Sequence, residues 1–128
     1  IDFGVARQIG GDDNAELGLW GTPGYMAPEQ IGRRACPAAD VYALGAILYE
    51  ALTGRVPYPG HSVMDVYRAI LAGGLTPPAK LNPRTPPDLE AICLKALAPD
   101  KRRRYPTARE FAMDLRRHLD GQPVLASA

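Results

Sequence analysis

The residues of this chain that could do chemistry gather near its beginning. Asp2 stands in Asp2-Phe3-Gly4, and Thr22 stands in Gly21-Thr22-Pro23-Gly24-Tyr25, just ahead of Ala27-Pro28-Glu29. A carboxylate is the kind of oxygen ligand that Mg²⁺ takes, and a threonine hydroxyl can both donate and accept a hydrogen bond. Taken alone, however, Asp2-Phe3-Gly4 reads as a turn at the end of a strand, and Thr22 as a turn hydroxyl.

Other polar side chains lack the companions that catalysis or metal binding requires. The two histidines have no partner at metal-ligand or catalytic-pair spacing, and Ser62 and Ser127 have neither a base nor an oxyanion-hole motif. Cys36 and Cys93 are far apart, with no His or Cys at ligand spacing. This argues against a zinc site or a disulfide framework and fits a reducing compartment.

Together, the two triplets resemble the last third of a protein kinase catalytic domain, because they occur in this order and are separated by a loop of activation-segment length. The resemblance implies a mainly α chain: the helical C-terminal lobe, incomplete, of a two-lobed α+β parent domain. It implies ATP and Mg²⁺ as cofactors, with Asp2 as the metal ligand. Phe3 would pack to hold the loop in its active position, and Gly4 would permit a backbone reversal. Thr22 would hydrogen bond a catalytic Asp and Lys, both expected upstream.

The resemblance also implies structural anchors. Ala27-Pro28-Glu29 would close the activation segment, and Glu29 would pair with Arg104, which precedes the final helix. Lys101 stands where many members of the family have proline, so Arg102 and Arg103 remain alternative registers for that arginine. Removing one partner of a buried pair of this kind typically costs about 3–5 kcal/mol.

Asp40, in Asp40-Val41-Tyr42-Ala43-Leu44-Gly45, resembles the central-helix aspartate that holds the backbone of the catalytic loop. The plainer interpretation is a carboxylate at a helix N-terminus, where the helix dipole favours negative charge. The two interpretations are compatible with each other.

The class of kinase is suggested by two further resemblances. Gly21-Thr22-Pro23-Gly24-Tyr25 resembles the substrate-facing segment of serine/threonine kinases, which implies protein substrates with Ser or Thr acceptors. The runs Cys93-Leu94-Lys95-Ala96-Leu97, Arg104-Tyr105-Pro106-Thr107-Ala108-Arg109-Glu110 and Leu119-Asp120-Gly121-Gln122-Pro123 look similar to the bacterial branch of the family.

Two rival functions are weighed against an active kinase. A pseudokinase, a binding scaffold with the same fold and no transfer activity, is disfavoured because Asp2 and Thr22 are present. A nucleic-acid module is suggested by the basic runs 101–104 and 116–118, but basic runs are usually solvated surfaces, and only Tyr105 offers an aromatic ring beside them. We therefore expect no nucleic-acid partner.

Organisation follows from the resemblance. We expect the kinase domain to cover residues 1–119, with the activation segment at 2–29 and helices up to 119, and a linker to start at 120–128. The glycine-rich loop, the ATP-pairing Lys with its Glu partner, and the catalytic Asp and Asn are expected upstream, so the isolated chain should be inactive. The helix that should cover one face of residues 40–53 is also expected upstream, so the isolated chain should be loosely folded. The kinase domain is expected in the cytoplasm, and an anchor elsewhere could attach the full-length protein to a membrane.

The loop between Gly4 and Gly21 contains no Ser, Thr or Tyr. Activation by phosphate on a hydroxyl of this loop is therefore chemically excluded. We expect Asp12, Asp13 and Glu16 to offer a permanent negative charge instead; the alternative is that these acids only keep the loop soluble.

Composition and periodicity place these motifs on helices. The chain is 46% hydrophobic with a net charge of +1, an ordinary globular mix with no overall attraction to polyanions or anionic lipid. Residues 40–53 are apolar on nearly every face, which predicts a central helix ending at Gly54. Capping signals predict helices after Ser62 and Thr107, ending at Gly73-Gly74 and Gly121. An apolar stripe at 89–97 predicts another helix, and the five prolines of 76–87 predict irregular structure.

Overall fold

The computed structural model describes residues 23–28, 37–60 and 62–127. This part of the chain is helical and contains no strand, as expected for the C-terminal lobe of a kinase. The short strand considered at residues 1–3 lies outside the described residues. The elements, in chain order, are η1 (Pro23–Tyr25), α2 (Pro37–Thr53), α3 (Val63–Ala72), α4 (Pro78–Leu81), α5 (Pro87–Ala96), η3 (Lys101–Arg103), α6 (Ala108–Leu119) and η4 (Leu125–Ser127).

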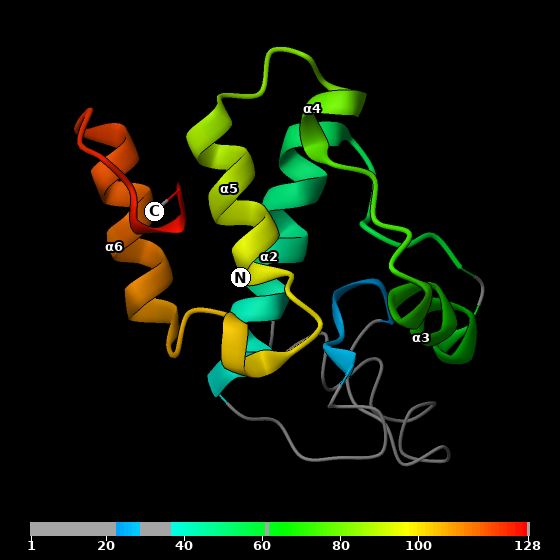
Figure 1. Cartoon of the computed structure of the whole chain (residues 1–128). Helices are drawn as coiled ribbons and strands as arrows, with labels where there is room; N and C mark the ends of the chain where they lie inside the picture. Colours follow the sequence, from blue (N-terminus) through cyan, green and yellow to red (C-terminus); the bar gives the residue numbers. More distant parts are fainter. Residues whose placement is uncertain (1–22, 29–36, 61, 128) are drawn as a thin grey trace.

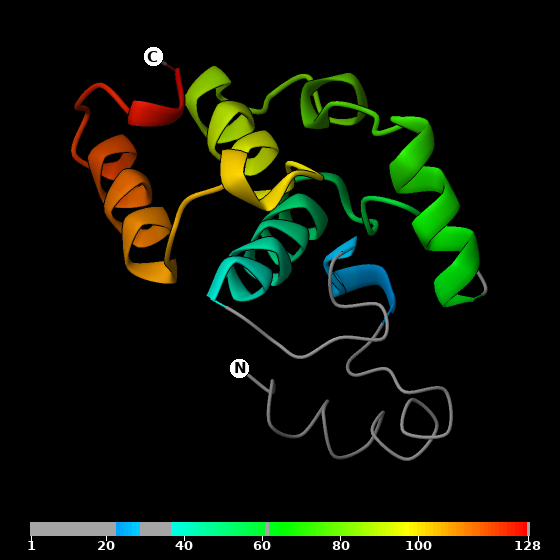
Figure 2. The same cartoon turned by 60° about the horizontal axis from the view of Figure 1, so that its bottom comes forward.

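Helix α2 is the centre of the fold. Val41, Tyr42, Ala46 and Tyr49 are each at most 1% exposed, because neighbours cover the helix on several sides. Figures 1 and 2 show α5 packed beside α2, with α6 against both of these helices and η1 between α2 and α3. The helix begins three residues earlier than the sequence predicted, at Pro37. Proline suits the first turn of a helix because its missing N–H would have no intrahelical partner there.

The capping signals are confirmed at three helix ends. The Ser62 Oγ accepts a hydrogen bond from the Asp65 N–H at 3.2 Å and starts α3, and the Thr107 Oγ1 accepts from the Glu110 N–H at 3.3 Å and starts α6. Gly73 ends α3 with φ +70°, a left-handed conformation that glycine adopts without steric cost.

The proline-rich segment is more regular than expected. The prediction of irregular structure over 76–87 was wrong, because Pro78–Leu81 forms the short helix α4 and Pro87 begins α5. In both helices proline occupies the first turn, where no N–H donor is needed. The Ala79 N–H, which no helical carbonyl can reach, donates instead to the Glu90 carboxylate at 2.8 Å.

Two clusters of buried side chains fill the space around α2. The first joins α2 to α3 and to the C-terminal half of α5, and the second joins α2 to α5, α6 and the chain after α6. At Gly45 the two helices α2 and α5 approach so closely that an added Cβ would lie 2.7 Å from the Ala96 Cβ. Ala96 and Leu97, both at most 1% exposed, form the opposite side of this contact.

The chain after α6 packs against the domain. Val124 is 4% exposed within the second cluster, and η4 lies against α5 (Figure 2). The point at which a linker begins stays a prediction. None of the helices in the described ranges is long and apolar enough to cross a bilayer.

Candidate functional site

Some of the predicted site residues lie in the described part of the chain and others lie outside it. Asp2, Phe3, Gly4, Thr22 and Glu29 lie outside the described part, so their predicted roles stay predictions. Among the residues that are described, no group of three or more His, Cys, Asp and Glu side chains could hold a metal ion. The structure therefore tests the predictions for Ala27, Pro28, Asp40 and Arg104 only.

The segment 24–28 is held from three directions. Ala27 is fully buried in the cluster around α2, and Met26, 3% exposed, packs against Val63 of α3. A Cβ added at Gly24 would lie 3.2 Å from Cγ1 of Val56, in the loop after α2. Pro28 is partly buried. The backbone that follows Thr22 is thus fixed against α2, α3 and the loop between them.

Tyr25 ties this segment to α2 by a polar contact. Its hydroxyl donates a hydrogen bond to Glu50 Oε1, which, together with burial, raises the pKa of Tyr25 to about 12. The sequence analysis assigned no role to Glu50. A signal was present, since Glu50 is the only charged residue of 41–53, but nothing local could identify a partner 25 residues away.

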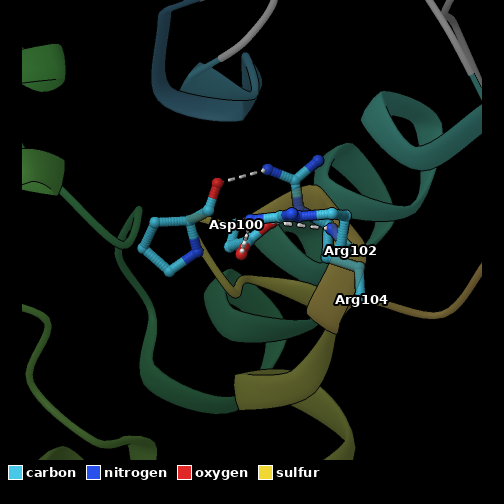
Figure 3. A network of polar contacts seen from close by, with 4 residues as sticks. Asp100, Arg102 and Arg104 are labelled. Carbon is cyan, nitrogen blue, oxygen red and sulfur yellow. Dashed lines mark hydrogen bonds and ion pairs between the residues drawn. The ribbon is translucent and has the colours of Figure 1, made fainter.

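Arg104 lies 3% exposed below the N-terminal end of α2 (Figure 3). Its guanidinium donates to three backbone carbonyls: Nε to Ala98 at 2.7 Å, Nη2 to Pro99 at 3.1 Å and Nη1 to Ala38 at 3.1 Å. The guanidinium carbon also lies 5.0 Å from the centroid of the Tyr42 ring, within cation–π range. Arg104 therefore joins the connection after α5 to the first turn of α2.

The neighbouring arginines are placed differently. Arg102 and Arg103 are exposed, and Arg102 pairs with Asp100 at 3.1 Å on the surface (Figure 3). The Arg102 side chain lowers the pKa of Asp100 by hydrogen bonding its carboxylate. Of these three arginines only Arg104 is buried, which is the register that the predicted pairing requires. Its predicted partner, Glu29, lies outside the described residues.

Asp40 is exposed in the first turn of α2. No hydrogen bond or ion pair joins its carboxylate to another described residue, so the only interaction that the structure gives it is with the helix N-terminus. Its predicted contact, the catalytic loop, is expected outside this sequence.

Tyr105 is not a stacking platform for bases. It is 3% exposed, its ring meets Phe111 edge-on at 5.7 Å, and its hydroxyl donates to Asp114 Oδ2 at 2.6 Å. The aromatic residue beside the basic run 101–104 therefore belongs to the core.

Comparison with known proteins agrees with the fold. Residues 1–115 match the protein kinase domain family. The probable serine/threonine-protein kinase PknB of Bifidobacterium longum is 37% identical over 134 residues, covering all of this chain and 19% of that protein. The tyrosine-protein kinase MasK of Myxococcus xanthus is 43% identical over 131 residues, covering 98% of this chain and 20% of that protein.

The serine/threonine-protein kinase PknB of Mycobacterium tuberculosis is 39% identical over 127 residues, covering 96% of this chain and 20% of that protein. This chain thus spans about a fifth of the length of the curated relatives it matches. The family match extends over the activation-segment motifs and the helices α2 to α5, and reaches Leu115 in α6. This chain belongs to the protein kinase family.

Proposed function

We propose that the protein containing this chain is a serine/threonine kinase that transfers the γ-phosphate of ATP to Ser and Thr hydroxyls of proteins. In this reaction the acceptor oxygen forms a bond to the γ-phosphorus, the bond to the bridging oxygen of ADP breaks, and the hydroxyl proton passes to a base. The observation that carries the proposal is the placement of segment 24–28, which is fixed on α2 and α3 directly after Gly21-Thr22.

Asp2 and Thr22 would serve different substrates, Asp2 the Mg-ATP and Thr22 the protein acceptor. Asp2 would hold Mg²⁺, which neutralises phosphate charge when it is bound with ATP. A carboxylate is a suitable ligand because Mg²⁺ takes oxygen donors and keeps several waters. Thr22 would position the acceptor side. The segment that follows it, residues 24–28, is held in place by Ala27 and by the Tyr25–Glu50 hydrogen bond. Pre-organisation of this backbone is what lets one hydroxyl stay in reacting position.

The acceptor class is the part most in need of a test, because the relatives' printed names include both serine/threonine and tyrosine kinases. The segment Gly21-Thr22-Pro23 favours Ser and Thr. Labelled ATP supplied to the purified full-length protein with a mixed protein substrate, followed by phosphoamino acid analysis, would separate the two. We expect phosphoserine and phosphothreonine; phosphotyrosine alone would overturn the assignment.

A set of variants separates transfer from binding. Asp2→Asn should abolish transfer, and Asp120→Asn, an exposed aspartate at the end of α6, should leave it unchanged. Thr22→Ala should lower kcat, and Thr22→Ser should restore it. Nucleotide binding without transfer in the wild-type protein would favour the pseudokinase alternative, a scaffold with the same fold.

We further propose that the loop 5–20 needs no phosphate for activity, because it offers no hydroxyl. Asp12, Asp13 and Glu16 would supply the negative charge to basic side chains of the same domain. Replacing all three acids with Ala in the full-length enzyme should reduce kcat. Unchanged activity would show that the acids serve solubility alone.

We also propose that the kinase domain works in the cytoplasm, where Mg-ATP is available. Cys93 supports this proposal: it is a free, fully buried thiol, and burial raises its pKa to about 12. Fractionation of cells that express the tagged full-length protein would test it, and would show in addition whether the protein sediments with membranes.

A further inference from the structure

The segment after α6 returns to the body of the domain. After Gly121, which adopts φ +72°, the chain brings Val124 into contact with the second core cluster. The next residues form η4 against α5, and the Ser127 hydroxyl donates to Asp88 Oδ1 at 3.2 Å. Figure 2 shows this end of the chain lying across the space between α6 and α5. We call residues 123–127 the strap.

Asp114 is the residue that binds the backbone of the strap. It lies on α6 with no exposed surface, and its carboxylate accepts four hydrogen bonds. Two come from the domain: Tyr105 Oη at 2.6 Å and Arg117 Nη1 at 2.9 Å. The other two come from the strap: the Leu125 N–H at 2.7 Å and the Ala126 N–H at 3.0 Å.

This distribution of donors distinguishes Asp114 from an ordinary core residue. A buried carboxylate without donors is strongly disfavoured, so those that persist are surrounded by N–H and O–H groups. Half of the donors to Asp114 are backbone amides of the strap. Burial by itself would raise the pKa of Asp114, but the hydrogen bonds from Tyr105, Leu125, Arg117 and Ala126 outweigh it and lower the pKa below its ordinary value.

The end of α6 does not depend on the strap. The Asp120 N–H donates to the Arg116 carbonyl at 2.9 Å and the Gln122 N–H to the Arg117 carbonyl at 2.8 Å, so the helix is closed before the strap reaches Asp114. If the strap lifted, Asp114 would keep Tyr105 and Arg117 and would gain access to water. Opening therefore requires no helix to unfold.

We infer that Asp114 is a latch for the strap: it fixes the path of the chain after α6 over α5, and its release opens residues 123–127 as a unit while the α-helices stay folded. Opening would remove Val124 from the second core cluster, which also contains Ile92 and Phe111. The inference rests on the described contacts alone and does not depend on the proposed transfer activity.

Hydrogen exchange of the full-length protein, followed by mass spectrometry, tests the latch. In Asp114→Asn one side-chain oxygen becomes a donor that faces other donors, so peptides covering 123–127 should exchange at least about tenfold faster while peptides of α2 keep their protection. The matched control is Asp120→Asn, which should change neither region. Unchanged exchange of the strap in Asp114→Asn would overturn the inference, and so would equal loss of protection in the strap and α2.

A second pair of variants decides the matter if Asp114→Asn does not fold. Leu125→Pro removes the strap N–H that Asp114 Oδ1 accepts and leaves Asp114 in place, whereas Leu125→Ala trims the same 55% exposed side chain and keeps the N–H. We expect faster exchange of the Ala126 amide in Leu125→Pro and wild-type exchange in Leu125→Ala. Equal exchange in the two variants, or unfolding of the whole domain by Leu125→Pro, would contradict the latch.

Discussion

Arg104 and Asp114 are both charged and buried, and both bond groups of the backbone, yet they connect very different parts of the chain. Arg104 gathers carbonyl oxygens, one of which, on Ala38, is 66 residues away in the sequence. Asp114 gathers N–H and O–H donors that are at most 12 residues away. A buried charge can thus bind distant elements together, or it can hold a neighbouring segment in place.

Arg104 and Asp114 differ in which part of the fold would be lost if the side chain were removed. Without Arg104, the connection after α5 would lose its link to the first turn of α2, and carbonyls of the interior would lose their donor. Without Asp114, the strap would come away and the helices would remain. We therefore expect global destabilisation in the first region and local opening in the second.

The largest effect is expected from Arg104→Met. Methionine retains much of the buried volume but leaves three carbonyls without their donor, and the cost should be about 3–5 kcal/mol of unfolding free energy. Urea unfolding of the full-length protein's kinase domain measures it. Arg103→Met, at an exposed neighbouring position, is the control and should stay within about 0.5 kcal/mol of wild type. Equal stability of the two variants would show that burial of Arg104 is energetically unimportant.

A smaller effect is expected at the packed contact between α2 and α5. In Gly45→Ala the new methyl group would meet Ala96 at 2.7 Å, so α2 and α5 would have to move apart, at a cost of about 1–3 kcal/mol. Gly74→Ala is the matched control, since a Cβ there meets no atom within 4 Å. Thermal unfolding should separate the two. A Gly45→Ala protein as stable as Gly74→Ala would mean that the helices can shift without cost.

The contribution of Asp114 to the free energy of unfolding should depend on pH. Its folded-state pKa is lowered, so the stability that it contributes is fully present above the ordinary Asp value of about 3.9 and is lost as pH falls through the lower folded value. Unfolding of wild type and Asp114→Asn should be compared from neutral to acid pH. The difference in unfolding free energy between the two proteins should be constant near neutral pH and should decrease below about pH 4. A difference that increases at acid pH would contradict a lowered folded-state pKa of Asp114.

The smallest effect is expected from Tyr25→Phe, which removes the hydroxyl that Glu50 accepts. Because the contact is solvent-accessible, the cost to unfolding should be below about 1 kcal/mol. The raised pKa of Tyr25 also predicts the pH dependence of this contribution. The free energy of unfolding that the hydrogen bond adds is fully present below the ordinary pKa of Tyr and is lost as the pH rises through about 12. Wild type and Tyr25→Phe should therefore converge in stability at strongly alkaline pH, and divergence there would exclude the hydrogen bond.

Local signals predicted most of the fold. Ser62, Thr107 and Gly73 set helix ends by interactions within a few residues, so their effects could be read from the sequence. Helix α4 was missed because prolines suggest irregular structure, although at the first turn they favour a helix. Arg104 was identified by resemblance and not by physical reasoning, since the Ala38 carbonyl that it binds is 66 residues distant.

The contacts of Glu50 and Asp114 were outside the reach of sequence reasoning. Asp114 looks like one more charged residue in a helix rich in charges, and its burial depends on a strap that the sequence presented as a linker. A pattern of residue types cannot show that a chain will turn back on itself. The metal-binding and acceptor roles of Asp2 and Thr22 remain predictions from the resemblance.

The measurement that tests the central claim most directly is phosphoamino acid analysis of protein substrates incubated with labelled ATP and the full-length protein, wild type and Asp2→Asn side by side. We predict phosphoserine and phosphothreonine from the wild type and no label from Asp2→Asn. Equal labelling by the two proteins, or no transfer by the wild type under conditions where it binds ATP, would contradict the claim.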